Sequence, residues 1–164
     1  WPEYRVQHLG DDGTDGPVIG WYPLEEKPNA KILVLRYLTE GGAAPSTGKF
    51  LTYREIPWGE VYFKQFQGRC LFRLAFGFGG KLDKFREIME RVGAQAISSG
   101  DVGYELEFMK GLFVRLILWA GDDEFPPSAQ ILFSDNFPAA FTQGEDMAVV
   151  GDVTIDMLKA LAAK

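Results

Sequence analysis

Three consecutive carboxylates, Asp122, Asp123 and Glu124, are the residues whose types and spacing first suggest chemistry. They follow an apolar run that ends at Gly121, and Phe125 and a Pro–Pro pair come directly after them. Carboxylates this close repel one another, so we expect the pKa of at least one to be raised unless a cation or backbone donors compensate. The segment predicts an acidic, proline-stiffened loop between two buried strands.

This acidic loop allows three interpretations. It could hold a hard divalent metal ion, with Asp101 or Asp135 completing a shell of oxygen ligands. One of its three carboxylates could instead act as a general acid or base on a small substrate. The plainest alternative is a solvated turn in which an Asp caps backbone N–H groups and Phe125 packs into the core. The sequence leaves all three open.

A second group of polar residues lies near the end of a predicted strand and on a predicted helix. Arg54 and Glu55 end the strand, while Tyr62 and Arg69 lie on the helix. The planar fork of an Arg could hold the carboxylate or phosphate of a ligand. The structural alternative, which we favour, is that Glu55 simply pairs with Arg69. The candidate ligand-binding residues are therefore Arg54, Tyr62, Arg69, Asp122, Asp123, Glu124 and Phe125.

The chain contains one cysteine, Cys70, and one histidine, His8. An iron–sulfur cluster held by four cysteines cannot be built from this chain alone, and neither can a Cys/His zinc site or a Cys–His nucleophile pair of ordinary spacing. Cys70 lies on the apolar side of a predicted helix, which predicts a buried, inert thiol. We expect a structural or surface role for His8. Any cofactor therefore remains unknown.

The charge pattern excludes several classes of partner. The net charge is −6, with no run of basic residues, so neither nucleic acid nor an anionic membrane surface is an expected partner. No segment approaches the roughly 18 apolar residues of a membrane span, and no signal sequence is visible. We expect a cytoplasmic protein. The chain begins at Trp1 rather than at a Met, which is compatible with a longer natural chain.

The hydrophobic pattern of these 164 residues, without repeats or linkers, predicts a single domain of the α+β class. We expect a small, mainly antiparallel sheet centred on strand 112–120. That strand is apolar on both faces, so helices should cover both. The predicted helices are 30–39, 60–76, 82–92 and 144–161, the other strands include 50–56 and 129–133, and the runs 4–9 and 17–22 form a hairpin or two edge strands.

Two helix details can be stated in advance. Gly68 inside the second helix costs about 1 kcal/mol relative to Ala, so close packing against another element is expected there. Thr142 and Glu145 have the spacing of a capping box at the start of the last helix. Gly151 and Asp152 interrupt the apolar pattern of that helix, which is compatible with one bent helix or two short ones.

The segment 102–116 predicts a β-hairpin. Apolar and polar residues alternate from Val102 to Phe108, and Met109–Gly111 has the composition of a tight turn. If Phe108 pairs with Leu112, the register places Leu106 opposite Val114, Tyr104 opposite Leu116 and Glu105 opposite Arg115. The last pair is a favourable cross-strand charge pair, which supports this register.

Five segments occur in an order that resembles a known family. They are ILVLRYL (32–38), TGKFLTYREIPWGEVYFKQF (47–66), GDVGYELEF (100–108), WAGDDEFPPSAQILFSD (119–135) and EDMAVVG (145–151). Together they resemble a family of domains of unknown function found mainly in anaerobic bacteria and archaea. The resemblance covers about residues 30–160, and its DEFPPSA block is the most specific part.

Some members of that family are described as iron–sulfur proteins because a cysteine-rich cluster module is fused to the same domain. The present chain departs from them, since with Cys70 alone it has no such module, although a partner could hold a cluster. The family implies no established reaction, so there are no catalytic residues to transfer.

We therefore expect a non-enzymatic binding or accessory module of anaerobic metabolism, with an aromatic-lined groove beside the acidic loop. A small-molecule ligand is one candidate occupant, and a redox or corrinoid protein is a candidate partner by family association only. The alternative is a small-substrate enzyme that uses Asp122, Asp123 and Glu124, with or without a divalent metal. A third hypothesis is a homodimer whose aromatic surface is the subunit interface.

Overall fold

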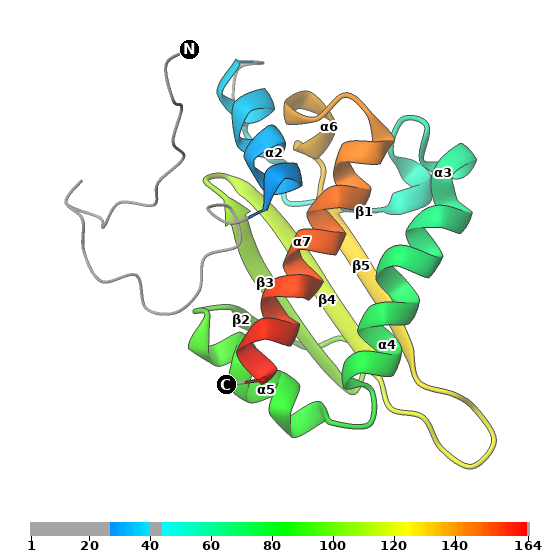
Figure 1. Ribbon diagram of the computed structural model, residues 1–164. Coiled ribbons are helices and arrows are strands. Elements are labelled where there is room, and N and C mark those ends of the chain that lie inside the picture. Colours follow the sequence, from blue (N-terminus) through cyan, green and yellow to red (C-terminus); the bar gives the residue numbers. More distant parts are fainter. Residues whose placement is uncertain (1–26, 40–43, 164) are drawn as a thin grey trace.

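The computed structural model describes residues 27–39 and 44–163, and it confirms the α+β class (Figure 1). A five-stranded antiparallel sheet has the order β1-β5-β4-β3-β2. Strands β2 to β5 form a meander, and β1 joins its edge beside β5. The strands are β1 (Phe50–Thr52), β2 (Gln95–Ile97), β3 (Val102–Met109), β4 (Leu112–Trp119) and β5 (Ser128–Ser134).

The four predicted helices are present with small shifts of their ends. The second is continuous but contains a π-helical turn, η2, between α3 and α4. No helix in the described ranges combines the length and apolarity needed to cross a membrane. The helical elements are α2 (Pro28–Thr39), the 3₁₀ turn η1 (Tyr53–Glu55), α3 (Gly59–Phe66), η2 (Gln67–Leu71), α4 (Phe72–Phe78), α5 (Leu82–Arg91), α6 (Phe137–Ala140) and α7 (Gly144–Ala162).

Several predictions need correction or lie outside the described residues. The strand predicted over 50–56 ends at Thr52, where the chain turns into η1. The predicted capping box is wrong, because Gln143 is the N-cap of α7 and makes no side-chain cap. Helix α7 runs unbroken through Gly151. The runs 4–9 and 17–22, with His8, fall in the part of the chain that is not described.

Within the described residues, helices cover only one of the two faces of β4 that were predicted to be covered. In Figure 1 the described helices that contact the sheet lie across one face, which carries the buried Val114, Leu116 and Leu118. On the opposite face, side chains of neighbouring strands pack over one another and so shield each other from solvent. The Arg115 guanidinium carbon lies 3.6 Å from the ring centroid of Phe50, and Arg115 Nε donates to Glu105 at 2.8 Å. These contacts partly cover apolar area that the sequence pattern assigned to a second layer of helices.

The predicted hairpin register is confirmed for three pairs, including Glu105 opposite Arg115. It fails next to the turn, where an irregularity between Glu107 and Met109 pairs Met109, not Phe108, with Leu112. The turn itself uses the positive φ of Gly111, whose N–H donates to the Glu107 carboxylate at 2.8 Å. The extra residue, Phe108, lies next to the tight turn and forms a β-bulge there.

Two helices approach closely at Gly151 of α7, which faces Cys70 of η2. A Cβ atom at Gly151 would lie 2.7 Å from Cys70 Sγ and 3.3 Å from Cys70 Cβ. By contrast, a Cβ at Gly68 would meet nothing within 4 Å, so the predicted close packing at Gly68 is wrong. The glycine that permits close packing is therefore on the opposite helix.

We expect Gly151→Ala to lower the free energy of unfolding by about 1–3 kcal/mol, because the added methyl group overpacks the contact with Cys70. Urea denaturation measures this change. The matched control is Gly68→Ala, which adds the same methyl group without a steric conflict and should raise the stability by about 0.5–1 kcal/mol.

A double-mutant cycle tests whether the destabilisation by Gly151→Ala comes from the contact with Cys70. Cys70→Ala removes the sulfur atom, so the added cost of Gly151→Ala should be smaller in that background. An equal cost in both backgrounds would show that Cys70 is not what restricts residue 151.

Candidate functional site

A cavity with a volume of about 330 Å³ opens at the edge of the sheet, beside the point where β1 ends. We call it the edge groove. Its walls come from Thr52–Arg54, from Phe63, Phe66 and Leu71 on the α3–η2 helix, and from Trp119 and Ala129–Ile131 on β4 and β5. Four segments that are distant in the sequence thus form one concave, largely apolar surface.

The groove exists because β1 is short. Its three residues pair only with Leu132–Ser134, so among the described strands none lies beside the Ser128–Ile131 part of β5 on that side. The strand stops because the Glu55 carboxylate accepts bonds from the Thr52 N–H at 2.7 Å and the Thr52 hydroxyl at 2.8 Å. These bonds lower the pKa of Glu55. The turn leaves alternate backbone groups of β5 directed toward the groove.

Two stacked aromatic rings form the floor of the groove. The rings of Tyr53 and Phe66 are nearly parallel, with centroids 3.9 Å apart, and both side chains are buried. The Tyr53 hydroxyl donates to the carbonyl of Gly144 at 2.6 Å, which links the floor to α7. Burial raises the pKa of Tyr53, so its hydroxyl stays protonated and keeps donating this bond.

An Arg lies at one end of the groove, and the chain leads into the acidic loop beyond the other end. At the Leu132 end of β5, the Arg54 guanidinium lies over the Phe63 ring, 4.0 Å from its centroid. Its side chain is more than half exposed, and it makes a long, exposed ion pair of 3.6 Å with Glu60. At the Ser128 end, the partly exposed Trp119 leads directly into the acidic loop.

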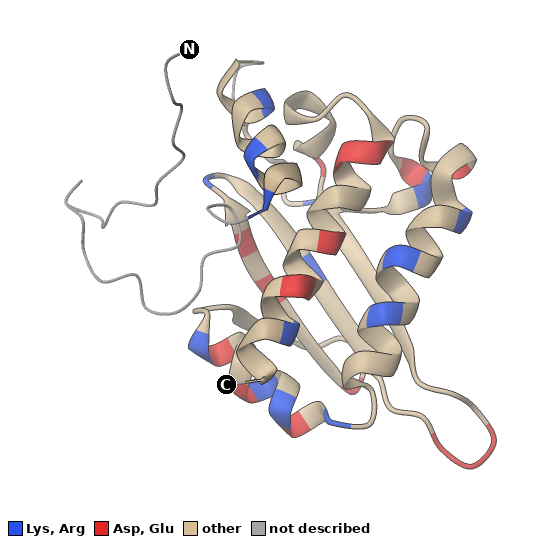
Figure 2. Cartoon of the chain, viewed as in Figure 1, with Lys and Arg blue, Asp and Glu red and all other residues tan. Residues whose placement is uncertain are grey.

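The acidic loop is a capped, solvated turn. Asp122 Oδ1 accepts bonds from the N–H groups of Glu124 at 2.9 Å and Phe125 at 2.7 Å. These bonds lower the pKa of Asp122, which is the opposite of the shift expected from repulsion. Phe125 is 66% exposed, so it does not pack into the core as the turn interpretation predicted. Figure 2 shows the acidic tip projecting away from the helices and the sheet.

The carboxylates proposed as metal ligands are not brought together. Asp101 accepts a bond from the Ala120 N–H at 2.8 Å. Asp135 follows the far end of β5 and binds Ser46 and Thr47, and these bonds lower its pKa. Within residues 27–39 and 44–163, no group of three or more His, Cys, Asp or Glu side chains is arranged to hold a metal ion.

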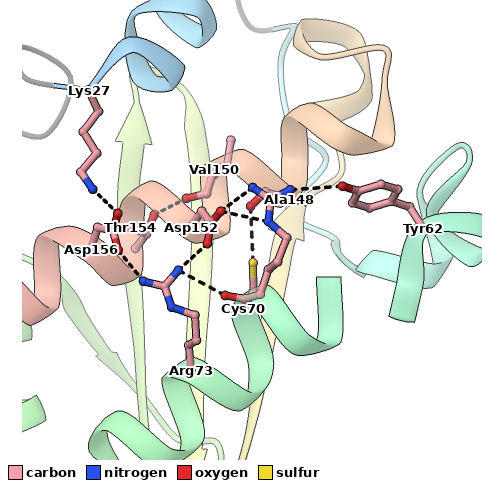
Figure 3. A network of polar contacts seen from close by, with 10 residues as sticks. Lys27, Tyr62, Cys70, Arg73, Ala148, Val150, Asp152, Thr154 and Asp156 are labelled. Carbon is pink, nitrogen blue, oxygen red and sulfur yellow. Dashed lines mark hydrogen bonds and ion pairs between the residues drawn. The ribbon is translucent and has the colours of Figure 1, made fainter. Parts of the chain in front are cut away.

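The second predicted group of residues is divided between two places. Arg54 lines the edge groove, whereas Arg69 bonds to the Tyr62 hydroxyl at 3.1 Å and to Asp152 of α7 (Figure 3). Glu55 binds Thr52 instead of Arg69, so the favoured pairing is wrong.

Figure 3 shows a polar network between the α3–α4 helix and α7, and Arg69 joins it through its bond to Asp152. Asp152 binds Arg69 and Arg73, and Asp156 binds Arg73 and Lys27. The prediction of a buried thiol is confirmed, because Cys70 is fully buried within this network and burial raises its pKa to about 12. The spacing of four residues in both helices is a signal for this network that the sequence analysis did not use.

Sequence reasoning missed most of the groove. It assigned Phe66 and its neighbours to the core, and it did not consider Thr52, Tyr53 or Ala129–Ile131. The available signal was the Thr52–Glu55 spacing, since a Thr followed three residues later by a Glu is typical of a turn rather than of a continuing strand.

The network predicts an acid-sensitive contribution to stability. Burial alone would raise the pKa of Asp156, but the bonds and charges of Lys27 and Arg73 outweigh it and lower the pKa. A lowered pKa means that Asp156 stabilises the fold above its ordinary value of 3.8 and loses this contribution as the pH falls through the folded value.

At pH 7 we expect Asp156→Asn to cost about 1 kcal/mol, because the contacts are charged but partly solvated. The difference from the unmodified protein should shrink below about pH 4, where the carboxyl group becomes protonated. Urea titrations across this pH range measure it. Asp83→Asn, which affects an exposed pair with Arg86, serves as control. A difference that stays constant down to pH 2 would contradict the assignment.

The comparison with known proteins gives one match. The model of the family "Domain of unknown function (DUF3786)" matches residues 2–157. No curated protein and no solved structure matches the chain. Because the family model covers nearly the whole sequence, the chain belongs to the DUF3786 family.

Proposed function

We propose that this domain is a binding module and that the edge groove is its binding site, with an apolar or aromatic group as the occupant. The observation that carries the proposal is the cavity of about 330 Å³ with a stacked aromatic floor, beside a part of β5 that pairs with no strand among the described residues. Small-molecule sites typically have volumes of about 300–1,000 Å³ and combine apolar walls with a few polar groups.

The polar groups of the groove are suited to orient an occupant. Arg54 offers a guanidinium over the Phe63 ring, and the Ser128–Ile131 part of β5, which pairs with no described strand, offers backbone donors and acceptors. The partly exposed Trp119 supplies apolar contact area at the other end. An aromatic group that carries a carboxylate therefore matches the site, with the ring over Tyr53 and Phe66 and the carboxylate at Arg54.

An accessory role in anaerobic metabolism, in the cytoplasm and beside a redox or corrinoid partner, is the biological setting that we propose. It rests on the family resemblance described above. The groove adds one expectation to this setting. The partner either provides the apolar group that enters the groove or competes with the groove for that group.

The enzymatic alternative has less support. The carboxylates of Asp122, Asp123 and Glu124 are exposed, and none of them lines the groove. A small substrate held inside the cavity would therefore not touch those carboxylates, which lie beyond the Ser128 end of the groove. We therefore advance no second function.

Phenylacetate is a suitable first probe. In ¹H–¹⁵N spectra we expect saturable shifts at the amides of Thr52–Arg54 and Ala129–Ile131. Ala129→Phe fills the cavity and should weaken phenylacetate binding at least about 10-fold. Arg54→Gln should weaken the binding of phenylacetate but not that of neutral benzyl alcohol.

The matched control for the filled cavity is Ala96→Phe, which places the same ring at an exposed position of β2, away from the groove. Thermal melts of all variants establish that they are folded. Shifts that map elsewhere, or phenylacetate binding that survives Ala129→Phe unchanged, would refute the proposed site.

A further inference from the structure

We propose that the natural occupant of the edge groove is an extended peptide segment of a partner protein, added as a strand to β5. Its central apolar side chain fills the cavity, an acidic residue on its N-terminal side meets Arg54, and a basic residue on its C-terminal side meets the acidic loop. This inference rests on the proposed function and specifies its partner class.

The first argument is the unpaired edge. The Ser128–Ile131 part of β5 has no neighbouring strand among the described residues, whereas Leu132–Ser134 pair with β1. Proteins usually cover or block such an edge, because free backbone groups recruit another strand. Four residues span about 13 Å, which is enough for a short strand whose main-chain bonds supply affinity.

The second argument is direction. β1 runs antiparallel to β5 and leaves the sheet at Thr52, where the groove begins. A peptide that continues the line of β1 would also be antiparallel to β5. Its N-terminal end would then lie at Arg54 and its C-terminal end at Trp119 and the acidic loop.

The third argument is side-chain spacing. Alternate residues of a strand point to the same side, so an anchor residue and the residues two before and two after it share one face. The anchor would lie among Tyr53, Phe63 and Trp119, which line the cavity. The flanking residues on that face would reach toward the two charged ends of the groove.

The fourth argument is charge complementarity. The whole segment 116–135 contains no Lys or Arg, so the carboxylates of its acidic loop are not balanced within the segment. Arg54 provides the opposite charge at the other end. A segment with its acid before the anchor and its base after it fits this gradient, and the reversed order places like charges together.

The probe is the peptide acetyl-Glu-Val-Phe-Val-Lys-amide, with binding to the full chain measured by calorimetry and ¹H–¹⁵N spectra. We expect the charge-reversed peptide acetyl-Lys-Val-Phe-Val-Glu-amide to bind at least about 5-fold more weakly at low salt, and replacement of Phe by Ala to abolish measurable binding. Equal affinity of the two charge orders would overturn the proposed polarity.

Backbone methylation tests strand addition directly. Two peptides, each methylated on one of two adjacent peptide nitrogens, should differ, because only one of these N–H groups faces β5. One methyl group should cost at least about 10-fold in affinity and the other little. If both peptides bind like the parent while phenylacetate still binds in the groove, the strand-addition inference fails and the proposed binding function stands. If neither peptide nor phenylacetate binds, both fail.

On the protein, the double variant Asp123→Asn and Glu124→Gln removes two charges without touching the Asp122 cap. This variant should reduce the difference in affinity between the two charge-reversed peptides. The control is the double variant Asp83→Asn and Glu87→Gln at remote, exposed positions of α5, which should leave that difference unchanged. Sedimentation addresses a second copy as occupant. A dimer that forms with rising concentration and that the peptide dissociates would overturn the assignment to a partner protein.

Discussion

The close crossing of α7 over η2 is the contact on which the rest of the structure depends. Gly151 lets the two backbones approach, and Cys70 fills the space that a side chain on α7 would otherwise take. Arg69 and Arg73 then reach Asp152 and fix the rotation of the α3–α4 helix on the sheet. That rotation places the ring of Phe66 over Tyr53. It also places the ring of Phe63 beneath Arg54, so a contact outside the groove sets the position of the groove wall. The π-helical turn at this point is a type of irregularity that is frequently found near functional sites.

The sequence predicted what depends on local periodicity. The α+β class, the order of the helices and most of the hairpin register follow from patterns within about 15 residues, and Glu105 opposite Arg115 was found in this way. The patterns failed where a residue's partner is distant. Arg69 pairs with Asp152 and not with Glu55, which is nearer in the sequence, because the packing of two helices brings the Arg69 and Asp152 side chains together. A strand that is apolar on both sides predicts helices on both faces, whereas on the second face the described residues show Arg115 packed over Phe50.

Of the residues that line the candidate groove, the sequence analysis had named only Arg54 as a ligand-binding residue. An aromatic groove beside an acidic loop was expected, but its walls combine Thr52–Arg54, the α3–η2 helix, Trp119 and β5, and each of these segments alone reads as core. The carboxylates drew attention because of their type. Their geometry instead shows a turn that Asp122 caps, with charges that lie at one end of a concavity made by other residues.

The position of β1 has a consequence for how the chain folds. Strands β2 to β5 are sequential neighbours and can form from local contacts, but Phe50 must find Ser134 across about half of the chain. Pairings of such large sequence separation are slow to form. The groove lies on the boundary between these two parts, with β5 on one side and η1 and α3 on the other. An occupant that contacts both sides would therefore act as a staple, since binding to the folded state alone shifts the equilibrium away from unfolding. Loss of the occupant would then make the domain easier to unfold, and so a better substrate for proteases.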